Sequence, residues 1–171
     1  MRRIFNQKTL LCLLTAGAIA GVMLACEDNA VRASEPTLQT FIPGGSVTVG
    51  YGVKREGKRD STGVNVAAVV GTPIATPVDA TVVEVSNEFR NEPRYGKAVV
   101  LKLADGTNVW ITHLDSYSVK PGDRLVAGDV FATVGKTRFM KVPHVHIEAY
   151  LASGVDRRVD PATVWPFLSK T

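Results

Sequence analysis

The stretch Pro143-His144-Val145-His146-Ile147-Glu148 decides the fold, because it places two histidines two residues apart within an apolar run. Alternation of this kind predicts a β-strand, in which residues i and i+2 point to the same side. The side chains of His144 and His146 are therefore expected side by side, with their bases roughly 6–7 Å apart. Imidazole titrates near neutral pH and binds transition metals, so the pair suits proton transfer or metal coordination. Two histidines satisfied by hydrogen bonds in an ordinary sheet would show the same pattern.

The one other histidine of the chain, His113, ends another apolar run. Alternation predicts that Val109, Ile111 and His113 share one face of a strand. Similar runs rich in valine and isoleucine recur along the chain, each ended by Gly, Pro or Asp. They predict strands near residues 64–69, 80–86, 97–103, 107–114, 130–134 and 144–151, with a short additional strand at 46–50.

Short turn signals separate these runs, which favours antiparallel pairing. Asp105-Gly106 predicts a tight hairpin turn because both residues tolerate positive φ. Lys120-Pro121-Gly122-Asp123 predicts a second turn. Asp160 followed by Pro161 predicts the start of a short helix, with the aspartate as N-cap. The sequence therefore predicts a mainly β protein, with a single antiparallel β domain and a short C-terminal helix.

Composition excludes several classes of protein. The chain has 171 residues, of which 45% are hydrophobic and 21% charged, as in an ordinary single globular domain. A formal net charge of +4 is too small to indicate a nucleic-acid partner. Two cysteines cannot form the disulfide framework of a small secreted scaffold. A soluble enzyme or a binding module remains.

The N-terminal segment is typical of an export signal, because basic residues precede an uncharged run at residues 9–25. Three outcomes stay open, namely cleavage after Ala33, lipidation of Cys26 and retention as a membrane anchor. Each places the domain in the periplasm or cell envelope, in contact with a membrane only through the N-terminal signal or lipid. We interpret residues 1–33 as a signal peptide or lipoprotein signal, 34–56 as a linker and 57–171 as the folded domain.

Six segments follow one another in a distinctive order. They are Gly57-Lys58-Arg59-Asp60-Ser61-Thr62-Gly63-Val64-Asn65, AlaAlaValValGlyThrProIle at 67–74, Ile111-Thr112-His113-Leu114, ValLysProGlyAspArgLeuValAlaGly at 119–128, the stretch 143–148 quoted above, and Asp160-Pro161. In order and spacing they resemble the lysostaphin/LytM-type zinc endopeptidases, which cut peptide cross-links of bacterial peptidoglycan. The resemblance implies a lysostaphin-type antiparallel domain with a β sheet of the duplicated-hybrid kind.

The resemblance also implies a role for each matching position. His146 stands at a zinc-ligand position, and His113 and His144 stand at the positions of two catalytic histidines. Ser61 and Asn65 occupy the other two ligand positions, where the family has histidine and aspartate. A catalytic zinc normally takes three protein ligands drawn from imidazole, carboxylate and thiolate. No cofactor is therefore expected, and the two catalytic histidines are interpreted as relics.

Two substitute metal sites remain open from the sequence. A one-residue shift could bring Asp60 inward, or the three histidines could hold a metal together. A basic cluster of Lys136, Arg138 and Lys141 replaces the small residues that precede H-x-H in the family. We interpret this cluster either as a solvated loop or as a binding site for peptide carboxylates or an acidic partner.

The sequence favours a non-catalytic protein of the cell envelope. It would bind peptidoglycan, or regulate or dock onto a wall hydrolase or an envelope complex. The alternative is an active or weakened zinc metalloendopeptidase that cleaves peptidoglycan cross-links. A structural component of a secretion or conjugation apparatus also remains, whereas a biotinyl- or lipoyl-type carrier is disfavoured because Asp105-Gly106-Thr107 offers no lysine at the hairpin tip.

Overall fold

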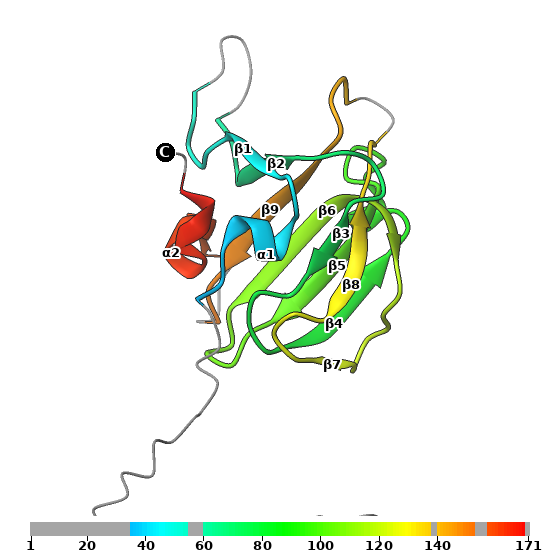
Figure 1. The fold of residues 1–171 in the computed structure, drawn as a ribbon, viewed down its shortest axis with the longest axis vertical. Coiled ribbons are helices and arrows are strands. Elements are labelled where there is room, and N and C mark those ends of the chain that lie inside the picture. The colour runs from blue at the N-terminus through cyan, green and yellow to red at the C-terminus, as the bar shows by residue number, and fades with distance from the viewer. Residues whose placement is uncertain (1–34, 55–59, 138–139, 153–156, 170–171) are drawn as a thin grey trace, which may run out of the picture. The chain divides into compact units, whose positions relative to one another are not determined.

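The computed structural model of the chain describes residues 35–54, 60–137, 140–152 and 157–169. These residues form a β domain with a few short helices (Figure 1). Its elements are α1 (Leu38–Phe41), β1 (Ser46–Val49), β2 (Val64–Ala67), β3 (Pro73–Ala75), β4 (Ala80–Ser86), η1 (Phe89–Asn91), β5 (Lys97–Lys102), β6 (Asn108–Tyr117), β7 (Arg124–Leu125), β8 (Val130–Val134), β9 (His144–Tyr150), β10 (Arg158–Val159), α2 (Pro161–Val164) and η2 (Pro166–Leu168). No helix in the described part is long and apolar enough to cross a membrane.

The strands pair in antiparallel fashion in the order β1-β2-β9-β6-β5-β4-β7. Strand β10 pairs with β9, and β8 pairs with both β3 and β6. The central place of β9 brings segments that are distant in the sequence together. Its residue His146 lies opposite Asn65 of β2 on one side and opposite Thr112 of β6 on the other.

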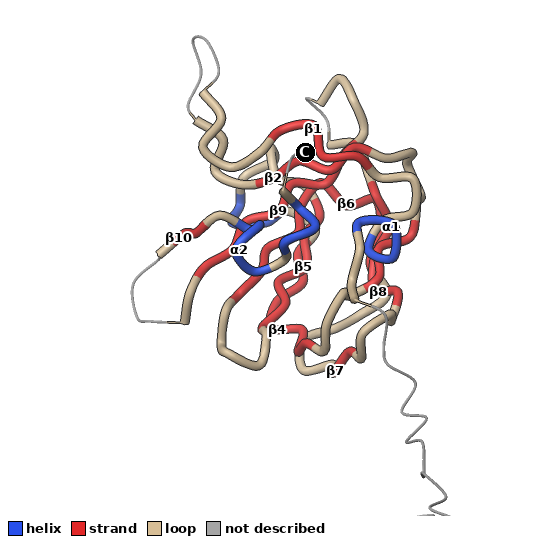
Figure 2. Tube along the Cα trace, turned by 60° about the vertical axis from the view of Figure 1, so that its left-hand side comes forward, coloured by secondary structure: helices blue, strands red, loops and turns tan. Residues whose placement is uncertain are grey.

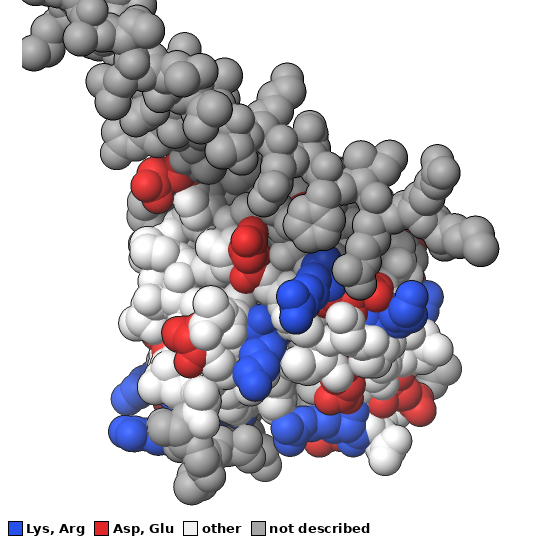
Figure 3. Space-filling view, turned by 90° about the horizontal axis from the view of Figure 1, so that it is seen from below, with Lys and Arg blue, Asp and Glu red and all other residues white. Residues whose placement is uncertain are grey.

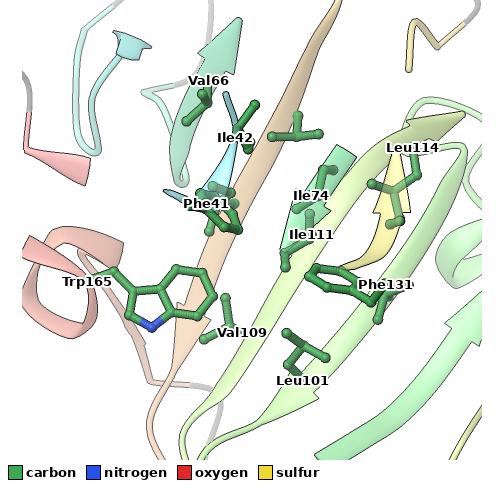
Figure 4. Packing of buried hydrophobic residues seen from close by; sticks show 14 of the residues in the cluster. Phe41, Ile42, Val66, Ile74, Leu101, Val109, Ile111, Leu114, Phe131 and Trp165 are labelled. Atoms are coloured by element: carbon green, nitrogen blue, oxygen red, sulfur yellow. The ribbon is translucent and has the colours of Figure 1, made fainter. Parts of the chain in front are cut away.

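The main hydrophobic core covers one face of this sheet. Alternate strand residues such as Val109 and Ile111 of β6 are buried there. They pack with Phe41 of α1 and with Trp165, which directly follows α2. The helices are drawn in blue in Figure 2, and Figure 4 shows the rings of Phe41 and Trp165 among the strand side chains. The centroids of these two rings lie 5.4 Å apart. Burying each large apolar side chain contributes about 1.5–3 kcal/mol, so this core stabilises the sheet. The described residues include no cysteine that could add a disulfide.

A smaller aromatic cluster lies on the opposite face. Trp110 follows Val109 on β6 and therefore points away from the main core, where it packs against Phe89 and Tyr150. The guanidinium of Arg90 lies 4.0 Å from the centre of the Trp110 ring. This stacking fastens the β4–β5 loop, in which Arg90 has a φ of 55°, onto the sheet.

The predicted fold class and strands are confirmed, including the short strand β1 and the helix that Asp160 caps. The Asp105-Gly106 turn connects β5 to β6, and Gly106 has a φ of 85°. Strands β3, β7 and β10 were not predicted, because two or three residues are too few to show alternation. The segment expected as a linker also contributes α1, which begins with a capping box at Thr37 and buries Phe41.

The expectation that His113 shares a face with Val109 and Ile111 is wrong. His113 has a φ of 65°, and the register between β5 and β6 shifts at this point. Such a bulge places an extra residue in one strand and interrupts the alternation of side chains. The side chain of the extra residue then points to the other face of the sheet. His113 therefore leaves the core face, and Leu114 takes the next core position.

Charged side chains of both signs are interspersed among the described residues on the face shown in Figure 3. A protein that binds a long polyanion through such a face presents a patch of one sign. This part of the surface therefore gives no support to a nucleic-acid partner.

Candidate functional site

A cleft of about 580 Å³ lies at the end of the sheet where the three histidines meet. It is lined by Asp60, Thr62, Asn65, Arg94, Tyr95, His113, Met140, His144, His146 and Arg158. The cleft thus brings together segments that are spread over most of the domain. Its floor comes from β2, β6 and β9, and one wall comes from the β4–β5 loop, whose Tyr95 carbonyl accepts the backbone N–H of His113 at 2.9 Å.

His146 lines the cleft, and protein side chains contact both of its ring nitrogens. Nδ1 lies 2.6 Å from the side-chain amide of Asn65 on the neighbouring strand. Nε2 lies 3.0 Å from Oε1 of Glu148 and 3.2 Å from the hydroxyl of Thr62. A carboxylate can only accept a hydrogen bond, so Nε2 donates to Glu148, and a neutral ring then accepts at Nδ1 from the Asn65 amide, which presents its NH2 group.

Glu148 is a buried carboxylate directly behind His146. Burial by itself would raise the pKa of Glu148, but hydrogen bonds from His146, Thr62 and Tyr150 hold it at about 2. Arg158 of β10 adds an ion pair, with its Nε 3.2 Å from Oε2 of Glu148. Glu148 is therefore ionised at neutral pH. Burial and then the contact with Glu148 raise the pKa of Tyr150, so its hydroxyl remains a hydrogen-bond donor.

His113 and His144 face each other above this floor, with ring centroids 5.0 Å apart. Burial, followed by repulsion from the other two histidines, lowers the pKa of His113 to about 3, so this ring is neutral at physiological pH. Its Nδ1 lies 2.9 Å from the hydroxyl of Thr137. Nδ1 of His144 donates to the carbonyl of Val142 at 2.8 Å. Both rings are thus held in fixed orientations by local partners.

We expect His144→Ala to lower the free energy of unfolding by less than about 1 kcal/mol, since the side chain is only partly buried. Urea unfolding followed by circular dichroism measures this change. His113→Ala is the matched comparison and should be more destabilising, because His113 is buried. A loss of 3 kcal/mol or more for His144→Ala would mean that the histidines form a cluster on which folding depends.

The resemblance assigns two further ligand positions to Ser61 and Asn65, and neither residue presents an imidazole, carboxylate or thiolate to the cleft. The hydroxyl of Ser61 is buried and donates to the carbonyl of Gly63 at 2.8 Å. Asn65 offers only a neutral amide. Asp60 and Thr62, on either side of Ser61, do line the cleft. Within the described residues, no three His, Cys, Asp or Glu side chains converge closely enough to hold a metal ion. The donor set therefore does not fit a catalytic zinc.

Several predicted site residues lie away from the cleft floor or outside the described part. Lys136 and Lys141 are exposed on the β8–β9 loop. Arg138 of the same predicted cluster, Cys26 and the export signal all lie outside the described residues.

Sequence reasoning missed the roles of Thr62, Tyr150 and Arg158. Of the residues in this network, only Glu148 could have been expected near His146 from the sequence. It ends the H-x-H stretch two residues after His146 and therefore lies on the same face of the strand.

Comparison with known proteins matches residues 59–161 of the chain to the model of Peptidase family M23. Cell division protein DipM of Caulobacter vibrioides is 34% identical over 128 residues, which cover 71% of this chain and 20% of that protein. Glycyl-glycine endopeptidase ALE-1 of Staphylococcus capitis is 33% identical over 89 residues, which cover 50% of this chain and 23% of that protein. The chain thus spans about a fifth of the length of these curated relatives.

The solved structures agree with this match. The catalytic domain of lysostaphin from Staphylococcus simulans is 29% identical and aligns with a TM-score of 0.60, over 73% of this chain and 92% of that domain. The family model covers more than half of the chain, and the three histidines of the cleft lie within the matched residues. This chain belongs to Peptidase family M23.

Proposed function

We propose that this protein is an exported component of the cell envelope whose M23 domain binds peptidoglycan, or docks onto a wall hydrolase or envelope complex, without cleaving peptides. The proposal is carried by Ser61 and Asn65, which by resemblance stand at two zinc-ligand positions and are engaged by neighbouring groups. The Ser61 hydroxyl bonds to Gly63, and the Asn65 amide contacts His146 directly.

The chemical consequence is the loss of the nucleophile. A bound zinc ion lowers the pKa of a coordinated water to about 7, which supplies hydroxide at neutral pH. With one imidazole remaining from the expected ligand set, no tightly held zinc is available to do so. His113 and His144 can still hydrogen-bond a peptide in the cleft, but they have no activated water to direct.

The choice of peptidoglycan as ligand draws on the relatives. Matching proteins include a glycyl-glycine endopeptidase, a DD-carboxypeptidase/endopeptidase of Neisseria meningitidis and lysostaphin. A groove related to those of peptide-cleaving enzymes is shaped for a peptide even after the metal is lost. The exposed Lys136 and Lys141 beside the cleft would attract the carboxylates of such a peptide or of an acidic partner.

One observation favours the alternative, a weakened zinc endopeptidase. Asp60 lines the same cleft as His113, His144 and His146. A movement that brought this exposed carboxylate to the histidines would assemble an unusual ligand set.

Zinc content separates the two functions. The purified full-length protein is incubated with zinc and desalted, and its zinc content is measured by inductively coupled plasma mass spectrometry. We expect close to no zinc per chain, both for the parent and for His146→Ala. Purified sacculi should bind the protein without release of peptides. About one zinc per chain, lost in His146→Ala and accompanied by release of peptides from sacculi, would replace the proposal with the alternative.

A further inference from the structure

Among the described residues, one acidic side chain is buried, namely Glu148 directly behind His146. Glu148 is only 2% exposed. Removing a carboxylate from water costs several kcal/mol unless protein groups replace the lost hydration. Three hydrogen-bond donors surround it, namely the Thr62 hydroxyl at 2.6 Å and His146 Nε2 at 3.0 Å on Oε1, and the Tyr150 hydroxyl on Oε2. Arg158 adds an ion pair, with its Nε 3.2 Å from Oε2, and donates its Nε–H to the Tyr150 hydroxyl at 3.0 Å. Both oxygens therefore accept hydrogen bonds from protein groups.

These groups come from three separate segments of the chain. Thr62 precedes β2, His146 and Tyr150 belong to β9, and Arg158 belongs to β10. The side chain of Asn65 adds a link from β2 to His146. Residues 62–65 are thus tied to residues 146–150 by direct hydrogen bonds. By resemblance, these are the two segments that a zinc ion joins in catalytic relatives.

The distance between Asn65 and His146 distinguishes a direct bond from a metal bridge. Two ligand atoms on a tetrahedral zinc, each about 2.0–2.1 Å from the metal, lie roughly 3.3 Å from each other. The side-chain amide of Asn65 and Nδ1 of His146 are 2.6 Å apart, which is the separation of a short hydrogen bond. The two strands are therefore already closed on each other at this point.

We propose that Thr62, Asn65, His146, Glu148, Tyr150 and Arg158 form a clasp that replaces the metal ion as the bridge between these segments, so that the cleft keeps its shape without zinc. Glu148 acts as a positioning residue, because it orients His146 and Arg158, which line the cleft. The inference rests on the proposed function, since a chain with a bound zinc would not need a second bridge.

Thermal unfolding of the full-length protein tests the clasp. The parent is expected to melt within about 1 °C of the same temperature in EDTA and in excess zinc. Glu148→Gln should lower the Tm on the order of 10 °C, because it leaves buried donors around a neutral amide. Thr62→Val, which keeps the side-chain shape, should lower it by roughly 3–5 °C. The matched controls are Glu84→Gln and Thr81→Val on β4, which should change the Tm by less than about 1 °C.

Two results would overturn the clasp. One is a rise in Tm of more than about 5 °C with zinc that His146→Ala abolishes. The other is a Tm for Thr62→Val and Glu148→Gln equal to that of their controls. If Glu148→Gln does not fold, Thr62→Val carries the test.

Binding of purified sacculi in EDTA tests the proposed function separately. If the variants show these Tm shifts but the parent has no affinity for sacculi, the clasp is supported and peptidoglycan is excluded as the ligand.

Discussion

The double substitution Ser61→His with Asn65→Asp is expected to raise the affinity of the chain for zinc by several orders of magnitude. It adds an imidazole and a carboxylate to His146 and thereby restores three ligands of the types that zinc prefers. The surroundings favour this result, because Glu148 already accepts a hydrogen bond from Nε2 of His146. A carboxylate behind a ligating histidine fixes the ring orientation and raises its basicity, which strengthens metal binding.

Competition with a fluorescent zinc chelator measures the change in affinity. Three controls isolate its origin. Each single substitution should gain far less than the pair, because a third ligand is still missing. Addition of His146→Ala to the double variant should remove the gain. If the double variant binds zinc no better than the parent, Ser61 and Asn65 are not the ligand positions of this domain.

Recovery of zinc need not restore peptidase activity. Met140 lines the cleft, and Lys141 and Val142 follow it, where the resembling family has small residues. Side chains of this size reduce the space for a substrate backbone. The double variant therefore tests metal binding separately from the access of a substrate to the groove.

The positions of the main strands could be predicted from the sequence. The face of the sheet to which His113 points could not. Alternation in 144–150 places His144 and His146 correctly on one side of β9. The same rule fails for His113, because a bulge depends on the neighbouring strand and leaves no trace in the residue pattern. Similarly, α1 has four residues, too few for helical periodicity, and its place is set by the burial of Phe41.

The site shows the same limit. Resemblance to the LytM-type motifs led to the three histidines and the two replaced positions, which lie within contiguous motifs. Thr62 and Arg158 escaped, because their importance arises from contacts with Glu148 across strands far apart in the sequence. A buried ionic contact can be recognised only after strand pairing has brought its members together.

Gly63→Ala is expected to destabilise the domain by at least about 3 kcal/mol. A Cβ atom at this position would lie 2.0 Å from the carbonyl oxygen of Ile147 and 3.0 Å from Cγ of Glu148. The obstacle is the backbone of the central strand β9, which cannot move aside as the end of a side chain can. Either β2 separates from β9 at its first residues or the methyl group displaces both strands.

The effect should extend to the cleft, because Gly63 directly follows Thr62, which donates to Glu148. Urea unfolding measures the loss of stability, and amide hydrogen exchange shows whether protection falls first in residues 62–66. Gly50→Ala is the matched control, since its Cβ would meet only Cγ2 of Val53 at an ordinary 3.7 Å. It should leave the free energy of unfolding within about 0.5 kcal/mol of the parent. Equal midpoints for the two variants would mean that β2 does not approach β9 as closely as the structure has it, and the Thr62 contact with Glu148 would then lose its geometric basis.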